Sequence, residues 1–186
     1  MKMTGIYGVG AAVAVSAILI WQSPLRVVAA PRENERASLQ TLIEKDEIKD
    51  MLVDYYSLFG NIARADWGAF YATDAVFDVN GIVRQGREPI NALYKTLRDT
   101  GNIHILITNQ KIVVNGGASA TVSFVWTDVI SKTHLETPQI VEQGHEQDEL
   151  VKQDGRWFFA KRVVTSDGGM PAALEKSYKA SGRGSR

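Results

Sequence analysis

The stretch from Ile43 to Phe59, IEKDEIKDMLVDYYSLF, has apolar residues at the spacing of one face of a long helix. This apolar stripe predicts that the helix packs against a large apolar surface. The stripe consists of Ile48, Met51, Leu52, Tyr55 and Phe59. Tyr55 and Tyr56 are adjacent near its end, and a buried tyrosine hydroxyl needs a hydrogen-bond partner. Tyr55 is therefore expected either to make a satisfied core contact or to form a pocket wall.

The composition favours one folded domain of ordinary size and excludes several classes of site. The chain has 186 residues, with 21 basic residues balanced by 21 acidic ones, so no general attraction to nucleic acid is implied. It contains no cysteine, which excludes disulfides, thiol catalysis and cysteine metal sites. Three histidines are few for a metal enzyme, and we predict no metal site.

Residues 1–30 have the pattern of a targeting segment. Lys2 is followed by an uncharged stretch from Met3 to Leu25, which is long enough to cross a bilayer. The segment is predicted to be a signal peptide cleaved after Ala29 or an uncleaved membrane anchor. The protein would then be exported, to a periplasm or outside the cell, or held at a membrane by this segment alone. Residues 31–38 are polar and are expected to form a linker.

The residue pattern in the rest of the chain predicts helices followed by a long antiparallel sheet. Ala75 to Val79 is expected to be a strand that ends at the turn pair Asn80-Gly81, and a helix is expected to begin near Gly86. β-branched and aromatic residues then dominate four runs, which are expected to be strands: 103–114, 120–130, 140–151 and 157–164. A shorter helix is expected around residues 65–71. Residues 166–186 are expected to be a flexible basic tail with a short helix around residues 172–178.

This order of elements resembles the SnoaL-like branch of the nuclear transport factor 2-like superfamily over residues 39–165. The motifs that carry the resemblance are Ile48 to Tyr55, Asp74 to Asp78, Gly86 to Ile90, Thr108 with Asn109, Gly117 to Ala120 and Asp148 to Trp157. The resemblance implies an α+β fold, a cone-shaped barrel in which a strongly bent, mainly antiparallel sheet wraps around three helices. It also implies a homodimer formed through the open face of the sheet.

The family includes polyketide cyclases, ketosteroid isomerases and dehydratases, and also members without catalysis, so the fold cannot decide the function. Its enzymes usually need no metal or cofactor. They hold an apolar substrate in the cone, where a histidine or carboxylate takes a proton and a tyrosine assists an oxygen. We therefore expect no cofactor here.

His104 is the first candidate for the proton-transferring base, because it lies close to where dehydratase-like relatives carry theirs. In the expected form of the motif, the histidine stands four residues before Asn109, a position that Ile105 holds here. A slip of one residue turns a strand side chain to the opposite face. His104 is therefore expected either to face the pocket or to form hydrogen bonds at a sheet edge.

Asp128 is the second candidate, and its strand resembles the one that carries a functional aspartate in bile-acid dehydratases. By the two-residue period it shares a face with Ala120, Val122, Phe124 and Trp126. A carboxylate on an apolar face needs a partner if buried. Asp128 is expected to pair with His104 or Tyr55, or to lie at the pocket mouth.

Other residues are expected to contact the ligand or to complete the site: Tyr56, Phe59, Asp78, Trp126 and Asp148. For Asp78 and Asp148 the sequence favours a turn or rim position over a pocket position, because aspartate favours such places. His134 and His145 are expected to be exposed. One departure from dehydratase-like relatives concerns the end of the long helix, where Gly60 and Asn61 replace their aspartate.

These observations leave three functional hypotheses. The leading one is a cofactor-independent lyase or isomerase acting on an apolar small molecule, with His104 as base, Asp128 orienting it and Tyr55 donating a hydrogen bond to the substrate oxygen. The second is a non-catalytic protein that binds a lipid-like or polycyclic ligand in the same cone. The third is a dimeric scaffold domain that works through its sheet face.

Overall fold

The structure is a computed structural model that describes residues 32–99, 102–131, 133 and 135–181. The predicted targeting segment, residues 1–30, and His134 lie outside the described residues. Within the described part of the chain, no helix has both the length and the apolar composition needed to span a membrane.

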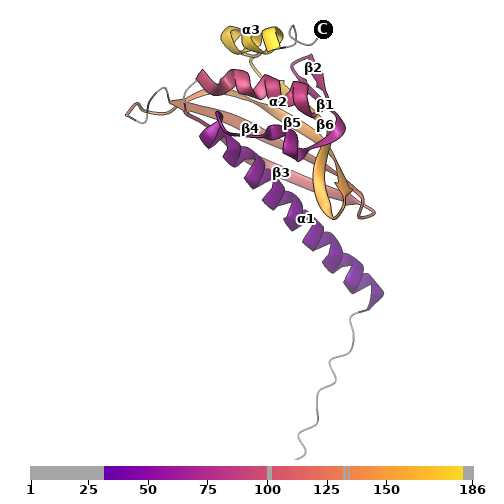
Figure 1. The fold of residues 1–186 in the computed structure, drawn as a ribbon. Coiled ribbons are helices and arrows are strands. Elements are labelled where there is room, and N and C mark those ends of the chain that lie inside the picture. The colour runs from indigo at the N-terminus through magenta and orange to yellow at the C-terminus, as the bar shows by residue number, and fades with distance from the viewer. Residues whose placement is uncertain (1–31, 100–101, 132, 134, 182–186) are drawn as a thin grey trace, which may run out of the picture. The chain divides into compact units, whose positions relative to one another are not determined.

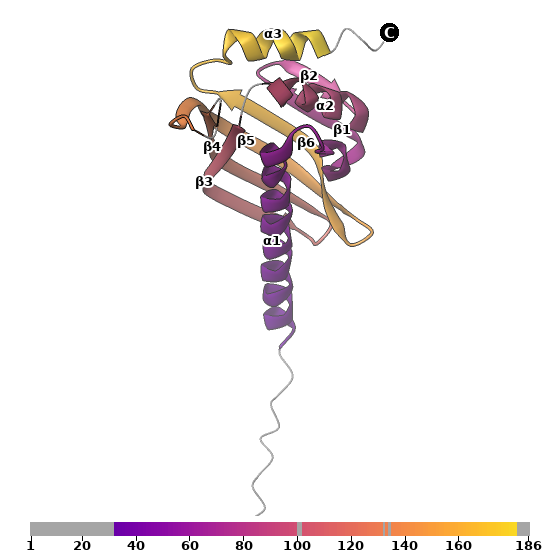
Figure 2. The ribbon, with the colours of Figure 1, turned by 60° about the vertical axis from the view of Figure 1, so that its left-hand side comes forward.

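Helix α1 (Glu33–Ser57) crosses one face of the sheet and packs against β3 and β6 (Figures 1 and 2). It begins inside the range predicted to be a linker, because Glu35 accepts a hydrogen bond from the backbone nitrogen of Arg32 at 2.8 Å and so caps the first turn. Ile48, Leu52 and Tyr55 are buried, as the apolar stripe predicts. The helix continues as a 3₁₀ turn, η1 (Leu58–Asn61), where the sequence predicts its end.

Six strands form one open, mixed sheet in the order β2-β1-β6-β5-β4-β3. Their bounds are β1 (Tyr71–Val79), β2 (Ile82–Gln85), β3 (Asn102–Asn115), β4 (Ser119–Ser131), β5 (Gln139–Gln153) and β6 (Arg156–Ser166). All neighbouring strands are antiparallel except β1 and β6, which are parallel. The predicted α+β class with a mainly antiparallel sheet is confirmed, although β2 and β3 remain as edges and the sheet does not close.

The remaining helices are short and complete the cover of the inner face. Helix α2 (Arg87–Lys95) packs on β1 and continues into η3 (Thr96–Asp99). The helix expected at 65–71 is a single 3₁₀ turn, η2 (Trp67–Phe70), whose Trp67 ring stacks on Tyr94 with 4.9 Å between ring centroids. The core lies between these helices and the alternating inner residues of the strands.

The packed part of the chain extends beyond residue 165, the predicted end of the domain. Helix α3 (Ala172–Ser181) lies over α2 and η3 (Figure 1). Arg84 on β2 donates from Nη2 to the backbone oxygen of Tyr178 at 2.5 Å, and the Tyr178 side chain is buried. The helix expected around residues 172–178 is thus present, and its packing contributes an aromatic residue to the interior.

Candidate functional site

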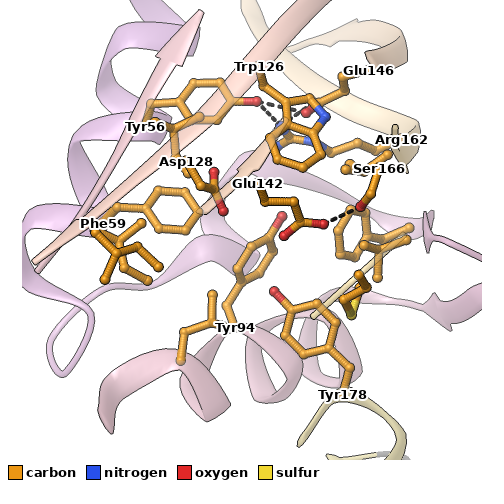
Figure 3. A pocket seen from close by; sticks show the side chains of 18 residues that line it. Tyr56, Phe59, Tyr94, Trp126, Asp128, Glu142, Glu146, Arg162, Ser166 and Tyr178 are labelled. Atoms are coloured by element: carbon orange, nitrogen blue, oxygen red, sulfur yellow. Dashed lines mark hydrogen bonds and ion pairs between the residues drawn. The ribbon is translucent and has the colours of Figure 1, made fainter. Parts of the chain in front are cut away.

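A cavity opens between the inner face of the sheet and the helices (Figure 3). The volume in which the centre of a water molecule fits is about 70 Å³. One buried water needs roughly 10–15 Å³ on the same measure, so the cavity is several times larger. Its walls are mainly apolar and aromatic, with a few acidic groups and one basic group. They are formed by Tyr56, Phe59, Phe77, Val79, Tyr94, Leu97, Ile103, Ile105, Trp126, Asp128, Ile130, Glu142, Glu146, Arg162, Val164, Ser166, Met170 and Tyr178.

Asp128 projects into this cavity from β4. Its Oδ1 atom is buried and has no hydrogen-bond partner in the described part of the chain. Burial raises the pKa of Asp128 to about 7, and the charges of Glu142 and Glu146 add to this effect. A carboxyl group with this pKa is present in both its protonated and ionised forms at neutral pH, which suits it to proton transfer.

Arg162 and two carboxyl groups form a buried charged cluster beside the cavity. The Arg162 guanidinium contacts Glu146 and donates to the Tyr56 hydroxyl, and its Nε lies 3.6 Å from Asp148 Oδ1. It also lies 4.3 Å from the centre of the Tyr55 ring. Burial raises the pKa of both carboxyl groups, and the charge of Glu146 raises that of Asp148 further. One guanidinium thus faces two carboxyl groups whose pKa values are raised by burial.

Trp126 forms a wall of the cavity and carries a buried hydrogen-bond donor. Its side chain is buried, and its Nε1 has no hydrogen-bond partner among the residues that the structure describes. The ring packs against Gly144, the residue directly opposite on β5. A Cβ atom at Gly144 would lie 2.7 Å from Trp126 Cζ2 and 2.0 Å from the backbone oxygen of Thr165. The position of Trp126 thus depends on a glycine at this point.

We therefore expect Gly144→Ala to destabilise the protein by roughly 3 kcal/mol, because β5 would have to move away from β6 and from Trp126. The free energy of unfolding in urea measures this loss. Gly60→Ala is the matched control, since no atom lies within 4 Å of the added Cβ. The control is expected to change the free energy by less than about 1 kcal/mol. Equal unfolding midpoints for the two variants would contradict the prediction.

The structure does not bring together the predicted trio of Tyr55, His104 and Asp128. Tyr55 lies in the core, where its hydroxyl bonds Tyr94 at 2.5 Å and Tyr71 at 3.0 Å, so it does not line the cavity. Its position follows from the regular helical stripe, which turns it toward the aromatic core.

His104 is exposed on the outer face of β3, and this corrects the expectation that it faces the pocket as a base. Its neighbours Ile103 and Ile105 line the cavity instead, as the two-residue period of a strand requires. His145 is also exposed and lies 3.3 Å from Asp167, as expected for a solvent-facing residue.

The other predicted site residues divide into two groups. Tyr56, Phe59 and Trp126 line the cavity with Asp128. Asp78 instead accepts a hydrogen bond from the backbone nitrogen of Gly81 at 2.8 Å in the β1–β2 turn, and Asp148 is buried beside Arg162 and does not line the cavity. Asp78 therefore stabilises a turn, and Asp148 belongs to the buried cluster around Arg162.

Six polar cavity residues are absent from the predicted set: Tyr94, Glu142, Glu146, Arg162, Ser166 and Tyr178. Glu142 and Glu146 have the same parity on β5 as Asp148, and this pattern could have indicated them. Arg162 could not have been found in this way, because a register shift between β5 and β6 turns it inward. Within the described residues, no group of three or more histidine, aspartate or glutamate side chains is placed to hold a metal ion.

Comparison with known proteins places this geometry in a family. The SnoaL-like domain matches residues 40–163. A variant of Rv3472, a protein of unknown function from Mycobacterium tuberculosis, is 21% identical and has a TM-score of 0.69, covering 78% of this chain and 92% of its own. No curated protein matches the chain by sequence.

Two structures from Novosphingobium aromaticivorans share the fold. A candidate scytalone dehydratase is 20% identical with a TM-score of 0.61, over 69% of this chain and 87% of its own. A nuclear transport factor 2-like protein with a cystatin-like fold is 17% identical with a TM-score of 0.63, over 80% of this chain and 98% of its own. With its mixed sheet, its covering helices and its matched residues, the chain belongs to the SnoaL-like domain family of the nuclear transport factor 2-like fold.

Proposed function

We propose that the protein is a lyase or isomerase that moves a proton on a small apolar molecule, with Asp128 as the group that takes it. The observation that carries the proposal is the Asp128 carboxyl group, which reaches an apolar cavity with one unpartnered oxygen and a pKa of about 7. In this mechanism, the carboxylate of Asp128 removes a proton from a carbon next to a carbonyl group. The enolate oxygen that forms then accepts a hydrogen bond from Trp126 Nε1.

Exchange of hydrogen for deuterium tests this proposal without knowledge of the natural substrate. A small cyclic ketone such as cyclohexanone is incubated with the protein in deuterated water, and loss of the α-proton signal is followed by NMR. Asp128→Asn is expected to slow the protein-dependent exchange by about 100-fold, and the wild-type rate should rise with pH through about 7 as the carboxylate forms. Asp78→Asn is the control, because that carboxylate lies in a turn outside the cavity. Equal rates in wild type and Asp128→Asn would contradict the proposal.

A non-catalytic ligand-binding protein is the second candidate. It is favoured by the position of His104 on the outer face and by Gly60 and Asn61 in η1, which offer no acid at the point where the resemblance to dehydratases implies one. Thermal stabilisation of the protein by the ketone without any protein-dependent exchange would select this function over the first.

We also propose that the protein dimerises through the outer face of the sheet. Exposed apolar side chains support this, since Leu106, Val113 and Ile140 all project from that face with exposed fractions of 52%, 41% and 72%. Light scattering coupled to size-exclusion chromatography is expected to give the dimer mass for the wild type and the monomer mass for Leu106→Lys. A wild-type monomer mass at all concentrations would contradict this proposal.

A further inference from the structure

We propose that Asp128 and Glu142 act as a pair of carboxyl groups that share one proton, and that Ser166 and Asn80 position Glu142 for this role. The inference rests on the proposed function, because it adds a second proton-transferring group to the reaction of Asp128. It also assigns a role to two residues outside the helices, at the ends of β1 and β6.

The register of the sheet places the two carboxyl groups next to each other. Asp128 on β4 lies directly opposite Glu142 on β5, and directly opposite residues of antiparallel strands project to the same face with Cβ atoms about 5 Å apart. Both residues line the cavity, and Figure 3 shows both carboxyl groups within it. The register shifts immediately after this pair, between Asp128 and Val129.

A short chain of hydrogen bonds fixes Glu142. The Ser166 hydroxyl donates to Glu142 Oε1 and itself accepts from Asn80 Nδ2 at 2.7 Å. Asn80 also accepts, through Oδ1, from the backbone nitrogen of Ser166 at 2.9 Å. Because Asn80 occupies a lone pair of the hydroxyl oxygen, the hydroxyl proton is directed to Glu142. In Figure 3 the other carboxyl oxygen of Glu142 points into the cavity.

The charges around the pair favour a shared proton. Burial is the main cause that raises the pKa of each carboxyl group, and for Asp128 the charge of Glu142 comes next. The groups that face the pair from neighbouring elements are Glu146, Arg162, Tyr56, Tyr94 and Tyr178. Arg162 is the single basic side chain among the described lining residues, and Glu146 already engages it. Two ionised carboxylates would therefore repel each other in an apolar cavity without a counter-charge of their own.

This arrangement supplies both a base and an acid for an elimination. Asp128, ionised, takes the proton from carbon while the electron pair of that bond forms the double bond. In the reacting form of the pair the shared proton lies on Glu142, which gives it to the leaving hydroxyl group, and that group departs as water. Asp128 is then protonated and Glu142 ionised, and transfer of one proton from Asp128 to Glu142 restores the starting state.

Carbon-13 NMR titration of the side-chain carboxyl groups tests the pair directly. In Glu142→Gln, which keeps an oxygen to accept from Ser166, we expect the midpoint of Asp128 to fall by about one pH unit or more, because the neighbouring charge is removed. Glu149→Gln is the control on the same strand, since Glu149 is exposed on the opposite face and is expected to leave the Asp128 midpoint unchanged.

The roles of Ser166 and Asn80 have their own readout in the same titration. The hydrogen bond from Ser166 lowers the pKa of Glu142, so Ser166→Ala is expected to raise the Glu142 midpoint and Ser166→Thr to restore it. Asn80→Ala is likewise expected to raise the Glu142 midpoint.

An unchanged Asp128 midpoint in Glu142→Gln would overturn the pair while leaving the proposed function intact. A wild-type Asp128 that titrates near 4 would overturn both the pair and the proposed function. A Glu142 midpoint that is the same in Ser166→Ala and in the wild type would overturn only the positioning role of Ser166 and Asn80.

Discussion

Replacing Asp128 with asparagine is expected to stabilise the protein at pH 8 by up to about 4 kcal/mol. The carboxyl group has an ordinary pKa of 3.8 in the unfolded chain and about 7 in the folded protein, because burial disfavours its charged form. Above pH 7 the folded protein must hold this charge in an apolar cavity, whereas the asparagine amide is neutral and of similar size. A residue whose removal stabilises the fold is typical of a functional site.

The stabilisation expected for Asp128→Asn depends on pH. Between about pH 4 and 7 the folded state binds a proton at Asp128 that the unfolded state has released, so the contribution of Asp128 to stability is present at low pH and is lost as pH rises through 7. The difference between the variant and the wild type should therefore be small near pH 4 and largest above pH 7. Urea denaturation at a series of pH values measures it.

Asp74→Asn is the matched control for this experiment. Asp74 is exposed on β1, and an exposed carboxylate keeps its hydration when the protein folds. The control is expected to change the free energy of unfolding by less than about 0.5 kcal/mol at each pH. An Asp128→Asn variant that is no more stable than the wild type at pH 8 would contradict the burial of this charge.

Arg162→Met is expected to destabilise the protein by about 3 to 5 kcal/mol at pH 7.5. Methionine fills similar space, but Glu146 and Asp148 then remain buried without the guanidinium that contacts them. Because burial raises the pKa of both carboxyl groups, protonation relieves this penalty at lower pH. The variant should therefore regain part of its stability near pH 5, which distinguishes a loss of counter-charge from a loss of packing.

Lys161→Met provides the control on the adjacent residue of β6. The Lys161 side chain is 51% exposed and pairs with Glu149 at 3.6 Å. Exposed ion pairs contribute little, so a change of less than about 1 kcal/mol is expected. Urea denaturation of both variants at pH 5 and pH 7.5 gives the four free energies. Equal losses at pH 7.5 would show that the buried cluster stabilises the fold no more than a surface pair does.

The fold could be predicted well because its signals are periodic and local. The helical stripe around Leu52 and the alternation on β4 that ends at Asp128 both appear in the structure on the buried faces where their periods place them. The predicted turn pair that begins at Asn80 adopts positive φ, with a value of 51° at Asn80. Such patterns depend on a few neighbouring residues, so they can be recognised without knowledge of the rest of the chain.

The site could be predicted only in part, because the period of a strand is interrupted where register shifts occur. Asp128 lies before the shift on its strand, so the two-residue period puts it on the same face as Trp126, and both line the cavity. Arg162 lies beyond a shift on β6, and alternation counted from Trp157 and Phe159 would turn it outward. Tyr55 shows a different limit, since helical periodicity places a side chain on the buried face but does not distinguish the core from a cavity wall.

Arg84 binds helix α3 through a hydrogen bond, and the docking of this helix affects when the ligand site is complete during synthesis. Tyr56, Trp126 and Tyr178 all face the same cavity, although they are far apart along the chain. A ribosome that has synthesised β6 has incorporated every carboxyl group of the cavity but not yet Tyr178. The ligand site is therefore complete only after the last helix has been made and has docked.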